Sequence, residues 1–280
     1  DAMSAIHAFR LALRVAERTD DLLACASAHY RLGLLQAGRG DTAAAIASFQ
    51  QALEVAHPSG NTMLALVGKV ALATALVRSG AWRRAEAVIA SALATAVDPR
   101  HARIRVRLLL LAAMIAVWRD GTEVADNAIA SVRAQASEAG DEEVLAEVDL
   151  LEAELCLDRR DPAGARRLLA VASDGARERG DGAHRVRSHI LLSEVERQAG
   201  NRDAADRHVG LAQRAIVGQR DLSLAGLVQR AAGRQNAERG QFTEAQHHFA
   251  QGLSIFRTLD DRRQVGGVHL DLGNLMLAAN

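Results

Sequence analysis

The feature that most constrains the fold of this chain is an internal repeat with a period of 40 residues. The repeats begin at seven equivalent positions: Asp21, Asn61, His101, Asp141, Asp181, Asp221 and Asp261. Six of the seven hold Asp or Asn. These two residue types are among the best caps for the N-terminus of a helix. Glycines mark a second turn midway through four repeats, at Gly40, Gly80, Gly200 and Gly240. Each repeat is therefore predicted to hold two helices of about 15 residues, a common length in globular proteins.

The second half of each repeat carries apolar residues at the spacing of one helical face. In the first and sixth full repeats these residues are Ala45, Phe49, Ala52, Leu53, Ala245, Phe249 and Leu253. Small residues such as Gly33 let two helices approach closely, and we expect a large residue such as Phe49 to fill the space left at the next interface. No proline interrupts a predicted helix, since Pro58 and Pro99 fall between repeats and Pro162 begins a helix.

The composition agrees with an all-helical protein. Hydrophobic residues make up 49% of the chain, which allows a large core, whereas aromatic residues make up only 3%. Lys plus Arg equals Asp plus Glu at 34 each, which argues against a protein that coats nucleic acid. The richest apolar stretch, residues 108–118, is too short to span a bilayer. Two distant cysteines, Cys25 and Cys156, give no disulfide framework, and no signal peptide is visible, so a cytoplasmic location is expected.

The Gly40–Asp41 turn is followed by a small residue, an aromatic residue and an alanine on one helical face: Ala45, Phe49 and Ala52. A Leu–Gly pair, Leu32–Gly33, precedes the turn. This pattern resembles the tetratricopeptide repeat, whose usual unit is about 34 residues. The resemblance covers the whole chain as a 40-residue variant with longer helices. It implies an all-α fold, an α-solenoid in which antiparallel helix hairpins stack into a right-handed superhelix. The variant is similar to the sensor arms of bacterial transcription activators.

The resemblance implies one solenoid domain over residues 1–280, which we expect to be part of a longer chain. It divides into a half repeat, six full repeats and a second half repeat: 1–20, 21–60, 61–100, 101–140, 141–180, 181–220, 221–260 and 261–280. The last half repeat is apolar on more than one side, at Leu270, Leu272, Leu275, Met276 and Leu277. Since terminal repeats normally carry a polar outer face, we expect this helix to be covered by further chain or by another chain.

No catalytic or cofactor motif is present in the sequence. The Gly68–Lys69 pair lacks the upstream glycine of a P-loop and is followed by Val70 where Ser or Thr belongs, and neither HExxH nor GxSxG occurs. The adjacent His247 and His248 would point about 100° apart on a helix, which rarely suits a single metal ion. We therefore expect no enzymatic activity, no metal and no cofactor.

The resemblance also implies that the first helix of each repeat lines a concave groove. The positions that it assigns to the groove are apolar in the first three repeats and charged in the next three. The candidates for contact with a ligand or partner are Tyr30, Leu34, Val70, Leu110, Met114, Trp118, Glu154, Arg187, Glu194, Arg197, Arg230 and Arg234. The apolar members have a second interpretation, as residues packed against the second helix of their own repeat. The charged members also have a second interpretation, as an ordinary solvated surface.

The sequence thus indicates a non-catalytic module for protein–protein or peptide interaction and sensing, the binding arm of a bacterial signalling or transcription regulator. An extended peptide or an amphipathic helix would lie in the groove, with Trp118 as its main apolar contact and opposite charges fixing its direction. Two alternatives are also compatible with the sequence: a sensor of a small, sugar-like molecule, and an assembly scaffold that associates with itself through its terminal helices. No membrane partner is expected, since no apolar run is long enough to span a bilayer. Direct nucleic-acid binding is not expected either, because arginines and carboxylates are interspersed.

Overall fold

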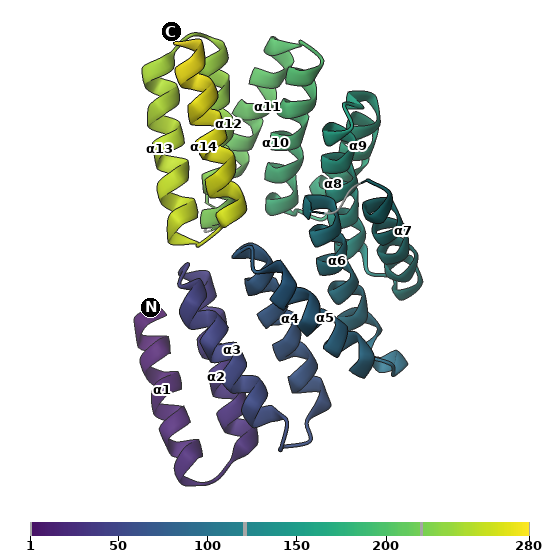
Figure 1. The fold of residues 1–280 in the computed structure, drawn as a ribbon, viewed down its shortest axis with the longest axis vertical. Helices are drawn as coiled ribbons and strands as arrows, with labels where there is room; N and C mark the ends of the chain where they lie inside the picture. Colours follow the sequence, from purple (N-terminus) through teal and green to yellow (C-terminus); the bar gives the residue numbers. More distant parts are fainter. Residues whose placement is uncertain (1, 120–121, 219–220, 280) are drawn as a thin grey trace. The chain divides into compact units, whose positions relative to one another are not determined.

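The computed structural model describes residues 2–119, 122–218 and 221–279 of the chain. Residues 1 and 280, the outermost positions of the two predicted half repeats, lie outside this part. The described residues form 14 α-helices, one short 3₁₀ turn and no strand, and consecutive helices pack against each other (Figure 1). This arrangement confirms the predicted all-α solenoid of repeats.

The helices alternate between the first and the second position of a 40-residue repeat. The first helices are α2 (Leu22–Gly38), α4 (Thr62–Arg78), α6 (Ala102–Arg119), α8 (Glu142–Asp158), α10 (Gly182–Gln198), α12 (Leu222–Glu238) and α14 (Arg262–Ala278). The second helices are α1 (Ala2–Arg18), α3 (Thr42–Ala56), α5 (Trp82–Thr95), α7 (Thr122–Ala139), α9 (Pro162–Glu178), α11 (Arg202–Ala215) and α13 (Phe242–Thr258). Two helices per repeat is the pattern that the sequence predicts.

Side-chain caps begin many of these helices. Asp21 Oδ1 accepts a hydrogen bond from Ala24 N, and Asn61 Oδ1 accepts one from Leu64 N, each at 2.9 Å. Equivalent caps come from Asp41, Asp141, Asp161, Asp181 and Asp221. Each cap gives a partner to a backbone N–H that the helix itself leaves unpaired. The acidic residues at the predicted repeat boundaries therefore set where these helices begin.

The turns follow the predicted repeat except at the start of the third repeat. Gly40 and Gly240 adopt φ angles of 82° and 72°, a left-handed conformation that glycine accepts without strain, so they end their helices as predicted. The third repeat begins differently. There the 3₁₀ turn Pro99–His101, capped by Asp98, leads into α6. A histidine at the first position of that repeat is therefore compatible with the fold, because the cap lies three residues earlier.

The contact between Phe49 and Gly33 sets the spacing of the first full hairpin. Phe49 is 1% exposed, and a Cβ built at Gly33 would lie 2.5 Å from the Phe49 ring. The same geometry recurs at Gly233, where a Cβ would lie 2.5 Å from the ring of Phe249. The expected use of Phe49 as a core residue holds. Its ring packs within its own hairpin, between α2 and α3, and it also borders the space next to α4 of the following repeat. Because glycine has no side chain, the aromatic ring can pack directly against the facing helix.

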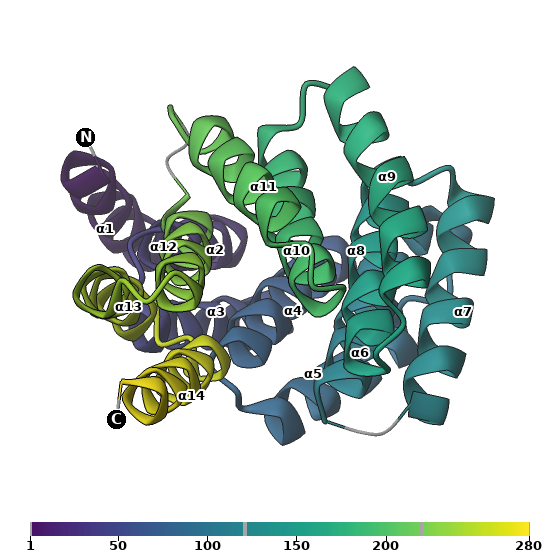
Figure 2. The same ribbon diagram turned by 90° about the horizontal axis from the view of Figure 1, so that it is seen from above.

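Contacts along the chain divide it into two compact units. The first unit is Asp1–Ile115 with Thr258–Asp261, and the second is Ala116–Arg257 with Arg262–Asn280. Within each unit the first helices of successive repeats also contact one another. In the first unit α2 contacts α4, and in the second unit α8 contacts α10. In the second unit α7 and α9 lie on the outer side of α8 (Figure 2). The first helices therefore form a continuous layer in each unit, and the candidate residues are on this layer.

Candidate functional site

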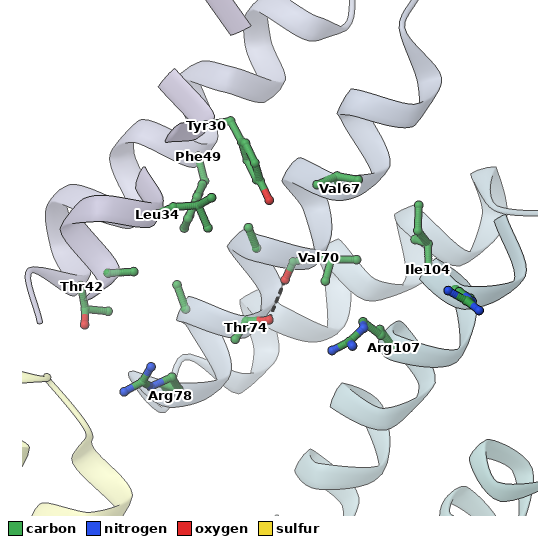
Figure 3. A pocket seen from close by; sticks show the side chains of 14 residues that line it. Tyr30, Leu34, Thr42, Phe49, Val67, Val70, Thr74, Arg78, Ile104 and Arg107 are labelled. Atoms are coloured by element: carbon green, nitrogen blue, oxygen red, sulfur yellow. Dashed lines mark hydrogen bonds between the residues drawn. The ribbon is translucent and has the colours of Figure 1, made fainter. Parts of the chain in front are cut away.

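The first unit contains a pocket of about 410 Å³ between α2, α3, α4 and α6. Most of its lining is carbon, from Leu34, Ala37, Phe49, Val67, Val70, Ala71, Ala75 and Ile104. The remaining lining residues are polar or cationic: Tyr30, Thr42, Thr74, Arg78, Arg103 and Arg107. Figure 3 shows these side chains around the pocket. The volume lies within the range of about 300–1,000 Å³ that is typical of ligand pockets.

The floor of the pocket follows from the glycine at position 33. Because Phe49 packs against Gly33, its ring reaches the pocket, and the Tyr30 ring lies beside it with centroids 6.0 Å apart. Burial raises the pKa of the Tyr30 hydroxyl, against the opposite effect of Arg31. The hydroxyl of Thr74 donates to the backbone oxygen of Val70 at 2.8 Å, so it is already engaged (Figure 3). Apart from the Tyr30 hydroxyl, the floor therefore offers mainly apolar contact.

The structure brings together only part of the apolar candidate set. Tyr30, Leu34 and Val70 line the pocket, and Leu34 is 45% exposed. Leu110 is only 8% exposed and Met114 is half-buried, and neither lines the pocket. Leu110 thus fits the alternative interpretation as a packing residue.

Trp118, in the second unit, is covered by side chains from two other helices. Its indole Nε1 donates to Glu154 Oε2 of α8 at 3.1 Å. The guanidinium of Arg263, from α14, lies 4.3 Å from the centroid of the indole ring, and its Nη2 is 3.0 Å from Glu154 Oε2. A cation over an indole face is an attractive contact in its own right. A ligand could reach the face of Trp118 on which Arg263 lies only by displacing it.

Five of the charged candidates form ion pairs with one another or with three further carboxylates. We call these eight residues the charge ladder: Glu147, Arg187, Glu194, Arg197, Arg230, Arg234, Glu238 and Asp271. Arg187 pairs with Glu147, and Arg197 pairs with Glu194. Arg234 is 2.9 Å from Glu194, in the repeat before it. Several of these pairs join residues about 40 positions apart, so they connect equivalent positions of neighbouring first helices.

The far end of the charge ladder is the most enclosed. Asp271 of α14 is 8% exposed and accepts from two arginines, Arg230 at 2.6 Å and Arg234 at 3.0 Å. Burial tends to raise the pKa of Glu194, but Arg234 and then Arg197 outweigh it and lower that pKa. Because these charges already have partners inside the protein, a ligand would have to replace existing ion pairs rather than meet bare charges.

A buried histidine extends the charge ladder in a way that the sequence reasoning did not find. His184 Nδ1 lies 2.5 Å from Asp181 Oδ2, and its Nε2 lies 3.2 Å from Glu147 Oε1. The contact with Glu147 is the largest influence on His184 and raises its pKa, against the effect of burial. Burial also acts against ionisation of Glu147, but Arg187 and His184 lower its pKa to about 2. The signal available in the sequence was the Asp181-x-x-His184 spacing at the start of a helix.

The described residues provide no metal site. No group of three or more histidine, cysteine or acidic side chains within them is arranged so that it could hold a metal ion. His208 faces His189, with ring centroids 5.6 Å apart, and burial followed by His208 lowers the pKa of His189 to about 4. His247 is exposed, and its neighbour His248 instead contacts Gln229. Within the same part of the chain, every helix falls short of the length or apolar character that crossing a bilayer requires.

The sequence reasoning missed the three pocket arginines, although a signal for two of them was present. Arg103 and Arg107 precede Leu110 and Met114 on α6 at helical spacings, so all four share one helical face. Extending the predicted groove by two turns toward the N-terminus of α6 would have included them.

Comparison with known proteins points to the same family as the repeat pattern. A family model described as the tetratricopeptide repeat matches residues 70–103, which run from within α4, through α5, to the first residues of α6. The matched segment supplies six of the pocket residues, five from α4 and Arg103 from α6. A search of curated proteins finds no match.

Proposed function

We propose that this chain, which carries a tetratricopeptide repeat within an array of helical hairpins, is a protein- or peptide-binding module without an active site. Repeats of this family generally bind proteins or peptides. The observation that carries the proposal is the apolar pocket, because it is built by the first helices of three successive repeats. Such a surface suits apolar side chains of a bound segment, which provide most of the affinity at peptide interfaces.

The contact surface that we propose begins with Tyr30, Leu34, Val67 and Val70. The partly exposed Met114 would extend it along α6. The charge ladder contributes less to affinity in this proposal, since its charges are paired within the protein. Its exposed edges would instead influence the direction and rate of association.

The test is selection of peptides from a random library on the immobilised 280-residue protein. The pocket variant Val70→Asp should lose the selected peptides, because a carboxylate placed in the pocket resists burial. The matched control is Val171→Asp, which puts the same charge on α9 at a position that is 68% exposed and outside the pocket. Selected peptides that bind both variants equally, or a library that yields no binder, would count against the proposal.

We place this module, as a finer proposal, in the ligand- or partner-binding arm of a bacterial signalling or transcription regulator. The support is the resemblance of the 40-residue variant to the sensor arms of transcription activators. Sequencing the coding frame on both sides of this segment tests the placement. An ATPase or helix-turn-helix domain in the same frame is the expected result, and stop and start codons at its ends would overturn it.

A small-molecule sensor is a second candidate, which the size of the pocket favours. Thermal melts in the presence of a metabolite library would show it as a rise in melting temperature, which the Val70→Asp change should abolish. A library without effect would remove this candidate.

An assembly scaffold is a third candidate, favoured by Leu270, Met276 and Leu277 on α14, which are 65%, 61% and 78% exposed. Light scattering over a range of concentrations tests it, since self-association should raise the apparent mass and a Leu277→Ser change should reduce that rise. A constant monomer mass would exclude self-association through α14.

A further inference from the structure

The pocket of the first unit combines an apolar floor with a cationic rim. Phe49, Val67 and Val70 give the floor, and the arginines come from two different helices, Arg78 from the last turn of α4 and Arg107 from α6 (Figure 3). Arg103 lies one helical turn before Arg107 on the same helix. Positive charge is therefore present at more than one side of a single apolar pocket.

No acidic side chain lines the pocket beside these arginines. Of the 14 described residues that line it, three are arginines and none is Asp or Glu. Arg78 and Arg103 form no ion pair with any described residue. The chain as a whole has equal numbers of basic and acidic residues, and arginines of the charge ladder such as Arg187 and Arg234 have carboxylate partners. The pocket thus carries a local excess of positive charge in an otherwise balanced protein.

We propose that this pocket binds an acidic peptide segment that inserts one apolar side chain, with Asp or Glu residues on both sides of it. This inference rests on the proposed function and specifies the chemistry of the partner. The apolar side chain would pack against Phe49 and Val70, and the flanking carboxylates would pair with Arg78 on one side and Arg103 on the other. Arginine is well suited to this role because its guanidinium presents several donors to a carboxylate.

The size of the pocket and its surroundings favour a side chain of a peptide over a whole helix. At about 410 Å³ it lies toward the lower end of the usual range of ligand pockets, so it holds a large side chain but not a packed helix. Leu34, at its edge, is 45% exposed and offers apolar surface for the neighbouring part of an extended segment. Charge complementarity then selects which segments bind.

The test uses three pools of short biotinylated peptides that share a central Leu or Phe and differ only in the flanking residues: Asp and Glu, Asn and Gln, or Lys and Arg. Apparent Kd values are measured on the 280-residue protein by biolayer interferometry at two salt concentrations. The acidic pool should bind about tenfold more tightly than the amide pool, since about two exposed ion pairs distinguish them. This preference should decrease at high salt.

Three single substitutions locate the effect. Arg78→Gln and Arg103→Gln should each weaken binding of the acidic pool about threefold, the size of one exposed ion pair, and leave the amide pool unchanged. Arg83→Gln is the matched control, because it removes an exposed arginine of α5 that does not line the pocket. Circular dichroism melts confirm that all three variants fold.

Each remaining outcome overturns the inference in a distinguishable way. Equal binding of the acidic and amide pools, with loss of both in Val70→Asp, would refute the charge selection but leave peptide binding in the pocket intact. Preference for the basic pool would refute the inference entirely. If no pool binds but decanoate does, and Val70→Asp abolishes that binding, the occupant is a small carboxylate rather than a peptide, and the proposed function fails with it.

Discussion

The pairing of Gly33 with Phe49 predicts a specific energetic coupling between two helices. Replacing Gly33 by alanine would place a Cβ 2.5–2.6 Å from two ring carbons of Phe49. The ring is 1% exposed, so it can give way only toward the pocket that it lines. The other repeats suggest the compensating change, because Ala153 occupies the position of Gly33 where Leu169 occupies that of Phe49, and these two residues share one core cluster.

The magnitudes follow from two opposing effects. The overpacked Cβ should cost about 1–3 kcal/mol, whereas alanine is favoured over glycine in a helix interior by about 1 kcal/mol. Gly33→Ala alone should therefore lower the free energy of unfolding by about 1 kcal/mol. In a Phe49→Leu background the clash is absent, so the same change should raise it by about 1 kcal/mol. The predicted coupling energy is thus about 2 kcal/mol, large for a pair in contact.

The assay is a double-mutant cycle measured by urea denaturation with far-UV circular dichroism. Hydrogen exchange of α2 and α3 amides supplies the local free energy of opening, which matters because repeat arrays need not unfold in one step. Gly266→Ala is the matched control. Gly266 is within helix α14, and a Cβ added there would meet no atom within 4 Å, so its alanine should simply stabilise. If Gly33→Ala stabilises as much as Gly266→Ala, or the coupling is below about 0.5 kcal/mol, the packing argument is refuted.

Three further predictions concern single residues. Phe49→Ala should lower the free energy of unfolding by about 3–5 kcal/mol because it empties a buried site, and a denaturation experiment that gives less than about 1 kcal/mol would remove Phe49 from the core. In a Trp82→Phe background, Arg263→Ala should shift the fluorescence emission of Trp118 to longer wavelength, because the indole ring gains contact with water. The control Arg202→Ala should leave the emission where it is. Unchanged emission in both variants would refute the stacking of Arg263 on Trp118. The pKa of His184 is raised in the folded state, so its stabilising contribution should be present below about pH 6.5 and be lost as the pH rises through that raised pKa. The stability difference between the wild type and His184→Gln, from urea midpoints, should accordingly shrink at alkaline pH, and a difference that does not change with pH would contradict it.

The helical repeat could be predicted because its signals are local. Asp21 and Asn61 cap helices through atoms three residues away, and Gly40 permits a left-handed turn through its own backbone. Neither effect depends on what the rest of the chain does. The burial of Phe49 was predicted correctly, but the close contact of its ring with Gly33 inside the same hairpin depends on how two helices pack and was not predicted.

The candidate site was only partly accessible from the sequence. Tyr30, Leu34 and Val70 were found because the groove positions recur every 40 residues. The same periodicity placed Glu194 and Arg234 on the first helices but could not show that they pair with each other across repeats. It also could not reveal that Arg263 lies over Trp118, since the two residues are far apart in the chain.

The sequence by itself determined the number and order of the helices, the caps and turns that bound them, and the face that the second helix of a repeat buries. These properties depend on interactions within one helical turn or one hairpin, whose geometry is fixed by residue type and spacing. The tertiary structure decided which charges have partners and which do not. Arg234 and Arg187 have carboxylates within reach, whereas Arg78 and Arg103 lie on an apolar pocket without one. That difference arises from distances between side chains of different repeats, and a pattern along the chain does not contain them.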